Sequence, residues 1–317
     1  MASIWTMGEL LCEVMRPQAD MPLHEAGEFI GPFPSGAPAI FIDTVARLGV
    51  DSGIIGGVGN DDFGKCLRDR LEKDGVDISQ IQIYEDGTTG VAFITYFQDG
   101  SRRFLYHFPD TPATRVKAPQ AEALGEDVAY FHIMGCSLMA KKEFGQEIVK
   151  LMKALALTGT KISFDPNIRP ELMKDETVRP QLAQVMEHCS IFMPGVSELL
   201  AISGKATVEE SVKAVFENPK LEIIVLKNGS RGCTIYTRET EIALGIYQVE
   251  TVDPTGAGDC FDAAFLCGLL EGKSLEEAAK EATAAAALNT MVLGPMEGAI
   301  SRENVATMLK EKTLIKN

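Results

Sequence analysis

The sequence Asp253-Pro254-Thr255-Gly256-Ala257-Gly258-Asp259 leads directly into an apolar stretch, 257–271, that ends before Gly272. Gly256 and Gly258 allow the backbone to turn tightly, so that several N–H groups can point at one anion. The helix expected over 257–271 adds the positive end of its dipole at the same place. Asp259, in the first turn, is then a carboxylate held beside an anion. The run therefore predicts a phosphoryl-transfer site with Asp259 as general base.

A glycine-rich turn before an acidic helix N-terminus produces the same pattern without any chemistry, so the surrounding sequence is needed to distinguish the two. The chain of 317 residues alternates short β-rich runs with helical stretches, as a parallel sheet covered on both faces requires. We expect buried strands at 54–58, 128–134, 161–165, 191–193 and 222–226. We expect helices at 37–48, 63–74, 143–157, 178–189, 208–217, 257–271, 275–291 and 303–310. No repeat or long linker divides the chain, which predicts one main α/β domain spanning 1–317.

Two segments, at about 12–35 and 88–108, lack the helical period. The second alternates as a hairpin does, over 91–97 and 102–106, with Asp99-Gly100 at the turn. We expect these segments to form a small β-sheet that projects from the main domain. Near the other end of the chain, Ser274 followed by Glu277 predicts a capping box at the start of the helix 275–291.

Composition limits the classes of partner. A formal charge of −15 argues against nucleic acid or an anionic membrane surface. No apolar run approaches the ~20 residues that span a membrane, and the N-terminus lacks the pattern of a signal peptide. The seven cysteines and four histidines show no metal-ligand spacing. We expect a cytoplasmic protein with reduced, buried thiols that binds a small molecule.

The run at 253–259 resembles the C-terminal signature of the ribokinase-like (PfkB) carbohydrate kinases. Their N-terminal signature is partly present at 35–39 and 57–64, and the segments 165–169 and 227–232 are similar to family segments, in the family's order. The resemblance covers about residues 4 to 300. It implies a ribokinase-like fold, with a mostly parallel central sheet flanked by helices on both faces. The small β-sheet would be a lid over the sugar, and we expect a homodimer through it because related kinases often pair there.

The resemblance implies ATP and Mg²⁺, and it assigns residues to them. Adenosine would lie against the loop that begins at Lys227, closest to Gly229 and Gly232, with Thr283 and Ala286 on the opposite wall. The phosphates would lie against Thr255, Gly256 and Gly258.

Metal positions follow from the same resemblance. Glu198 is similar to the Glu of an Asn-x-x-Glu motif that organises Mg²⁺ through water, although Gly195 replaces the Asn. Asp253 and Thr255 match positions that bind a monovalent cation in many relatives, so we expect that K⁺ can bind there.

The sugar site is where this chain departs from the family pattern. The expected substrate-binding residues are Glu13, Gly36, Ala37, Ile40, Arg103, Tyr106, Asn167, Arg169 and Asp259. Among them, Ile40 replaces an Asn that contacts sugar hydroxyls and Glu13 replaces an Asp, while Ser35 replaces a neighbouring Gly. A site built to pair a hydroxyl discriminates strongly against analogues that lack it, so these changes should alter selectivity.

The sequence therefore predicts an ATP-dependent kinase that phosphorylates a primary hydroxyl of a monosaccharide. Asp259 would take the hydroxyl proton, and N–H groups of 256–258 would hold the charge of the transferring phosphoryl group. A ketohexose of the fructose or tagatose type is the leading acceptor. The alternative is 2-keto-3-deoxygluconate, whose carboxylate Arg169 and either Arg103 or Tyr106 could bind.

Two further hypotheses assign the chain to other functional classes. A dinucleotide-dependent oxidoreductase needs Gly-x-Gly-x-x-Gly after the first strand, and residues 5–10 do not supply it. A non-catalytic regulator that binds a sugar or a nucleotide is opposed by the intact 256–259 run, but the altered Ile40 leaves it open.

Overall fold

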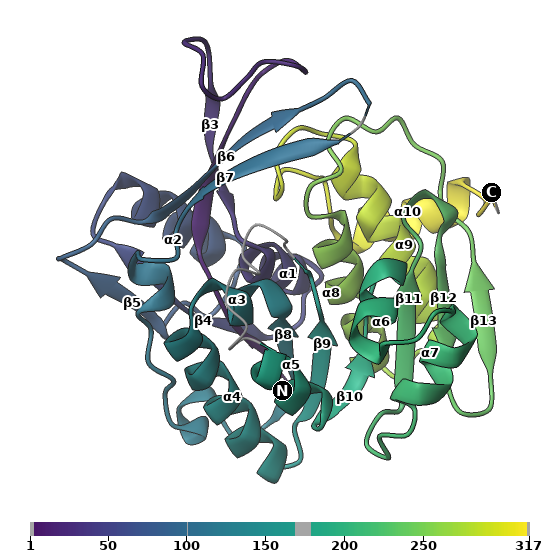
Figure 1. Cartoon of the computed structure of the whole chain (residues 1–317). Helices are drawn as coiled ribbons and strands as arrows, with labels where there is room; N and C mark the ends of the chain where they lie inside the picture. Colours follow the sequence, from purple (N-terminus) through teal and green to yellow (C-terminus); the bar gives the residue numbers. More distant parts are fainter. Residues whose placement is uncertain (1–2, 100, 169–178, 316–317) are drawn as a thin grey trace.

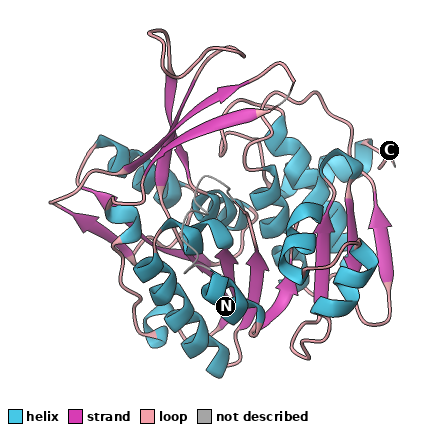
Figure 2. Ribbon diagram, viewed as in Figure 1, coloured by secondary structure: helices cyan, strands magenta, loops and turns pink. Residues whose placement is uncertain are grey.

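The computed structural model describes residues 3–99, 101–168 and 179–315. Within these ranges, nine strands form one sheet in the order β13-β12-β11-β10-β9-β8-β1-β4-β5, and four form a second in the order β3-β2-β6-β7. Helices cover both faces of the larger sheet (Figures 1 and 2). The predicted α/β architecture with a small additional β-sheet is confirmed.

The strands of the main sheet are β1 (Ser3–Met7), β4 (Ser52–Gly59), β5 (Ile81–Tyr84), β8 (Val128–Met134), β9 (Lys161–Asp165), β10 (Cys189–Phe192), β11 (Ile223–Lys227), β12 (Cys233–Tyr236) and β13 (Glu241–Leu244). All neighbours from β11 to β5 are parallel, whereas β12 and β13 add to one end in antiparallel pairs. The carboxyl ends of the parallel strands therefore lie along one edge, which is where open α/β sheets bind ligands.

The helices are α1 (Ala37–Arg47), α2 (Asp62–Lys73), α3 (Gly135–Ala140), α4 (Lys142–Leu157), α5 (Arg179–Met186), α6 (Val196–Ser203), α7 (Val208–Val215), α8 (Ala257–Leu270), α9 (Leu275–Thr290) and α10 (Arg302–Glu311). Short 3₁₀ helices lie at Pro112–Thr114, Ala121–Leu124 and Gly229–Arg231. The predicted capping box of α9 is present, because the Glu277 N–H donates to Ser274 Oγ and the Ser274 N–H donates to Glu277 Oε2.

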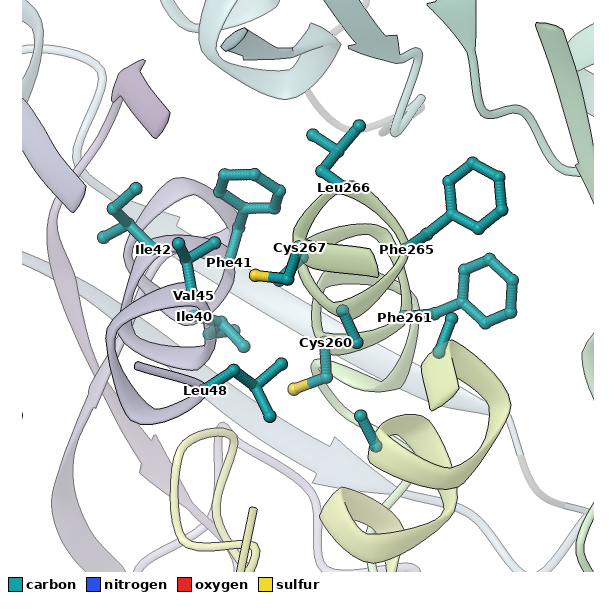
Figure 3. Close-up of a cluster of buried hydrophobic side chains, with 14 of the residues drawn as sticks. Ile40, Phe41, Ile42, Val45, Leu48, Cys260, Phe261, Phe265, Leu266 and Cys267 are labelled. Atoms are coloured by element: carbon teal, nitrogen blue, oxygen red, sulfur yellow. The ribbon is translucent and has the colours of Figure 1, made fainter. Parts of the chain in front are cut away.

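Two apolar clusters, one on each face of the main sheet, hold these helices. Successive residues of a strand face opposite sides, so Ile54 joins the cluster of α1, α8, α9 and α10, while Ile55 joins that of α4 and α5. Figure 3 shows the first cluster, where Phe41 of α1 lies beside Cys267 of α8. Burial of this apolar surface fixes α8, and with it the helix N-terminus that carries the signature run.

The second sheet, which we name the lid sheet, consists of β2 (Leu11–Met15), β3 (Ile30–Ser35), β6 (Gly90–Tyr96) and β7 (Arg102–His107). β2 pairs with β3 antiparallel and with β6 parallel, and β6 and β7 form an antiparallel hairpin. Only residues 8–10 separate β1 from β2, so the lid sheet begins at the carboxyl edge of the main sheet and lies above it in Figure 1. Gly100, at the expected hairpin turn, lies outside the described residues.

Some elements differ from the sequence-based expectations. The helix predicted over 178–189 ends at Met186, because Cys189 already pairs as the first residue of β10. The prediction missed α3, a buried helix of six residues that is too short to show a period. All seven cysteines are free thiols, and six of them are buried. No helix in the described ranges is both long enough and apolar enough to cross a membrane.

Candidate active site

Polar residues from separate parts of the sequence meet at the carboxyl edge of the main sheet. Glu9 follows β1, Asn167 follows β9, and Lys227 ends β11. Asp259 lies in the first turn of α8. Two pockets open around this group, and the signature run lies between them.

The first pocket, which we name the lid pocket, lies beneath the lid sheet and spans about 490 Å³, including space open to solvent. The lid sheet contributes Leu11, Glu13, Ser35, Arg102, Phe104 and Tyr106. The main domain contributes Glu9, Gly36, Ala37, Ile40, Phe108, Cys136, Asn167, Thr255, Gly256 and Asp259. Seven of the nine residues expected to bind the sugar therefore line one pocket, and the exceptions are Arg103 and Arg169.

Arg103 requires a correction. Along β7, Arg102, Phe104 and Tyr106 alternate with exposed neighbours, so they face the pocket while Arg103 is exposed on the other face. Arg102 therefore takes the position expected for Arg103. The sequence analysis expected both 103 and 106 at the sugar site, but residues three apart on a strand face opposite sides of the sheet. Arg169 lies outside the described residues.

The second pocket, which we name the loop pocket, lies beside the loop that follows β11 and spans about 1140 Å³, including space open to solvent. Lys227, Gly229 and Gly232 line one side of it, and Thr283 and Ala286 of α9 line another. All five were expected at an adenosine site. The remaining lining includes the apolar surfaces of Phe261 and Tyr247, against which a planar base can pack.

The signature run separates the two pockets. Thr255, Gly256 and Asp259 line the lid pocket, whereas Pro254, Ala257 and Gly258 line the loop pocket. Gly256 caps α8 with φ at +79°, a left-handed conformation in which a Cβ would also lie 2.9 Å from the Pro295 carbonyl oxygen. The N-terminus of α8 is thus a shared wall, and a group bound against it is reachable from both sides.

Asp259 is buried and is oriented by Asn167. The Asn167 side-chain amide donates to Asp259 Oδ1 at 3.2 Å, and its backbone N–H donates to Asp165 Oδ1 at 3.0 Å. Asn167 adopts a positive φ of 39°, which few residues other than glycine tolerate. The turn after β9 therefore directs the amide at the predicted base.

Lys227 joins this arrangement through a buried ion cluster. Its ammonium donates to Asp165 Oδ2 at 2.9 Å and to Asp262 Oδ2 at 2.8 Å. Burial alone would lower the pKa of Lys227, but the two carboxylates outweigh it and raise that pKa. Burial likewise opposes ionisation of Asp165, yet the Lys227 charge lowers the Asp165 pKa. Burial raises the pKa of Asp262 well above its usual range, against the opposing effect of the Lys227 charge.

Glu13 and Ser35, two of the departures from the family pattern, contact each other. The Ser35 hydroxyl donates to Glu13 Oε1 at 2.8 Å, while Oε2 has no hydrogen-bond partner among the described residues. Burial raises the pKa of Glu13 to about 7, against the opposing effect of the Ser35 hydrogen bond. Glu13 thus offers the lid pocket an open acceptor whose charge changes near neutral pH.

Glu9 was not predicted and is a further carboxylate of the lid pocket. It accepts from Ser137 Oγ at 2.5 Å and from Cys136 Sγ at 3.1 Å, both in α3. Its position directly after β1 was a usable signal, because loops at this edge bind ligands.

Glu198, Asp253 and Thr255 are the residues that the sequence analysis expected near metal ions. Both oxygens of Glu198 accept backbone N–H groups, of Ile168 and Gly195, each at 2.7 Å. A carboxylate has about four acceptor sites, so Glu198 retains capacity for the water shell of a hydrated Mg²⁺. Asp253 and Thr255 are buried and hydrogen-bonded to other groups of the chain. Within 3–99, 101–168 and 179–315, no cluster of three His, Cys, Asp or Glu side chains could hold a metal ion.

Comparisons with known proteins agree with this geometry. A family model described as pfkB family carbohydrate kinase matches residues 1–301. Fructokinase-1 of Oryza sativa subsp. japonica is 31% identical over 298 residues, covering 91% of this chain and 92% of that protein. Fructokinase-1 of Zea mays is 29% identical over 315 residues, covering 96% and 97%.

Solved structures are also similar. The E. coli protein described as "a putative Ribokinase II", in complex with ATP and Mg²⁺, superposes with a TM-score of 0.92 at 37% identity, covering 98% of this chain and 99% of that one. Fructokinase from Xylella fastidiosa with bound ATP has a TM-score of 0.85 at 22% identity, covering 98% of each chain, and shows the fold alone.

A pH-dependent stability difference is expected for Glu13→Gln. An acid whose pKa is about 7 when folded and 4.5 when unfolded loses its proton more readily on unfolding, so its contribution to stability falls as pH rises between these values. The Glu13→Gln variant has no such acid. Its free energy of unfolding should therefore rise relative to that of the wild type, by up to about 3 kcal/mol, as the pH increases from 4.5 to 7. Urea unfolding across this range measures it, with the exposed Glu239→Gln as control. A difference that does not change with pH would contradict the assignment.

The ion cluster leads to a second prediction. Lys227→Met leaves the buried Asp165 charge unpaired and should cost about 3–5 kcal/mol of unfolding free energy. Asp262→Asn keeps the shape of the side chain and an oxygen that can accept from the Lys227 ammonium, so it should cost less than Lys227→Met. Urea unfolding at neutral pH compares the two. Equal losses in the two variants would contradict this ranking.

Proposed function

This chain belongs to the pfkB family of carbohydrate kinases, and from that premise we propose that it transfers the γ-phosphoryl group of ATP to a primary hydroxyl of a neutral monosaccharide. A ketohexose such as fructose is the leading acceptor, in line with the fructokinases among its relatives. The observation that carries the proposal is the signature run, which lines one pocket with Asp259 and the other with Gly258.

In this mechanism, ATP occupies the loop pocket and the sugar occupies the lid pocket. The γ-phosphoryl group lies at the N-terminus of α8, where backbone N–H groups of 256–258 and the helix dipole stabilise its negative charge. Mg²⁺ bound with ATP supplies further neutralisation of the phosphates, and Glu198 is the carboxylate that would hold its water shell. Thr255 lines the lid pocket, so it faces the acceptor more directly than the nucleotide.

Asp259 removes the proton from the sugar hydroxyl as the oxygen attacks the phosphorus in line. Asn167 holds Asp259 Oδ1, which leaves the carboxylate in one orientation as the hydroxyl approaches. The lid sheet covers the acceptor, and exclusion of water suppresses hydrolysis of ATP.

The charge of the lid pocket favours a neutral acceptor. Glu9, Glu13 and Asp259 line it, and Arg102 is the one basic residue among its described lining. A sugar acid would bring another carboxylate into this surrounding and would be repelled. Arg103 is exposed on the opposite face of β7, so the alternative acceptor, 2-keto-3-deoxygluconate, would have to bind its carboxylate at Arg102 instead. A neutral ketohexose, by contrast, can donate hydroxyl hydrogens to Glu13 Oε2.

The outer face of the lid sheet supports the proposed homodimer. Leu105 of β7 is 48% exposed, and Phe29, just before β3, is 36% exposed. Apolar side chains exposed on one face of a sheet are suited to association with a second copy of the chain.

Asp259→Asn should lower kcat by about 10²- to 10⁴-fold, because the amide cannot accept the hydroxyl proton. KM for the sugar should change little, since the amide retains the shape of the site. Initial rates of ADP release measure both constants, and circular dichroism verifies that the variant is folded. Near-full activity of this variant would exclude Asp259 as the base.

The acceptor is tested by ADP release with fructose, tagatose, glucose, ribose, 2-keto-3-deoxygluconate and adenosine. We expect kcat/KM for a neutral ketohexose to exceed that for the sugar acid by at least about 100-fold, or about 2.7 kcal/mol. A preference for the sugar acid would refute the acceptor class. ADP release that no sugar increases would instead favour a regulator that does not transfer phosphate.

A further inference from the structure

The acceptor atoms of Asp253 are bonded to donors of this chain. Oδ1 accepts the Thr255 N–H at 2.9 Å and the Tyr96 hydroxyl at 2.7 Å. Oδ2 accepts the Gly294 N–H at 3.0 Å. Asp253 is buried, so these bonds are shielded from competition by solvent. The carboxylate that would hold a monovalent cation is therefore already surrounded by hydrogen-bond donors.

Thr255 is bonded in the same way. Its Oγ1 lies 2.6 Å from the Tyr96 hydroxyl and 3.2 Å from Arg102 Nη1. Its carbonyl oxygen accepts the side-chain amide of Asn289 at 2.7 Å. Both side chains expected to coordinate a cation, and the Thr255 carbonyl beside them, thus face N–H and O–H groups instead.

The direction of these hydrogen bonds can be assigned. An ionised carboxylate only accepts and a guanidinium only donates. Arg102 therefore donates to Thr255 Oγ1, Thr255 donates to the Tyr96 oxygen, and Tyr96 donates to Asp253. Burial and the Asp253 charge raise the pKa of Tyr96, which keeps its hydroxyl protonated for this role. A continuous chain of bonds links the Arg102 charge to the Asp253 charge.

Arg102 also places a positive charge beside Thr255. It lines the lid pocket together with Thr255, Gly256 and Asp259. A monovalent cation coordinated by Thr255 would lie close to the guanidinium and would be repelled by it. The residues present do not fit the cation that the family resemblance implies.

We propose that Arg102 takes the place of the monovalent cation, so that this kinase needs no K⁺ and receives the positive charge beside the α8 N-terminus from its own lid sheet. The inference rests on the proposed kinase function. Arg102 begins β7 and Tyr96 ends β6, so one hairpin carries both contacts to the signature run. The Arg102 charge therefore lies beside the signature run only when the lid sheet covers the lid pocket. This links phosphoryl transfer to closure of the lid sheet over the sugar.

The kinetic test compares K⁺, Na⁺ and tetramethylammonium chlorides at equal ionic strength. Wild-type kcat should vary by less than about twofold among them. Arg102→Ala should lose about 10- to 100-fold in kcat, and K⁺, but not tetramethylammonium, should restore at least about fivefold of that loss. Arg102→Lys keeps the charge and should remain independent of the cation. Arg103→Ala, one residue away on the outer face of β7, is the matched control and should respond to the three cations as the wild type does.

A second test measures thermal unfolding and does not depend on kinase activity. With ADP present, K⁺ should raise the unfolding temperature of Arg102→Ala above its value in tetramethylammonium, and should leave the wild type unchanged. A wild type that K⁺ activates or stabilises would overturn the proposal. So would an Arg102→Ala variant whose defect no cation repairs. If no sugar stimulates ADP release, the kinase function fails, and the thermal arm still decides whether Arg102 occupies a cation site.

Discussion

The ammonium of Lys227, held between the buried side chains of Asp165 and Asp262, makes the interaction on which the site depends. These residues come from β11, β9 and α8, so one charge cluster joins three elements at the carboxyl edge of the main sheet. Apolar packing tolerates small shifts, but a buried charge that loses its partner is strongly destabilising. The cluster therefore fixes the position of α8 relative to the sheet, and through Asp165 it also fixes the turn that carries Asn167.

The two pockets follow from this constraint. With α8 held in place, its N-terminus divides a space that would otherwise be continuous, and the signature run contributes residues to both sides. The lid sheet completes one side because β2, one of its strands, follows β1 of the main sheet after residues 8–10 only. Only side chains on one face of β7 can then reach the run, and Arg102 and Tyr106 lie on that face. The separation of the two pockets, which we propose hold acceptor and nucleotide, is thus a consequence of strand and helix geometry.

Local patterns in the sequence predicted much of this site. Glycines at 256 and 258, the loop glycines at 229 and 232, and the position of Asp259 in a first helical turn all express short-range backbone requirements. Pairings between distant residues were not predictable in the same way. Ser35 bonds Glu13 across 22 residues, and Lys227 meets Asp262 across 35. The choice between Arg102 and Arg103 depended on strand register, and the alternation of 102, 104 and 106 contained that information.

The charge balance explains why the phosphate site is built from backbone and helix rather than from lysines. The chain carries a net charge of −15, so its overall field repels ATP. Lys227, which lines the loop pocket, is neutralised by Asp165 and adds little attraction. In the proposed function, positive potential at the shared wall comes from the α8 N-terminus, from Mg²⁺ bound with the nucleotide, and from Arg102. Because Arg102 belongs to the lid sheet, part of that potential is supplied by the same element that encloses the sugar.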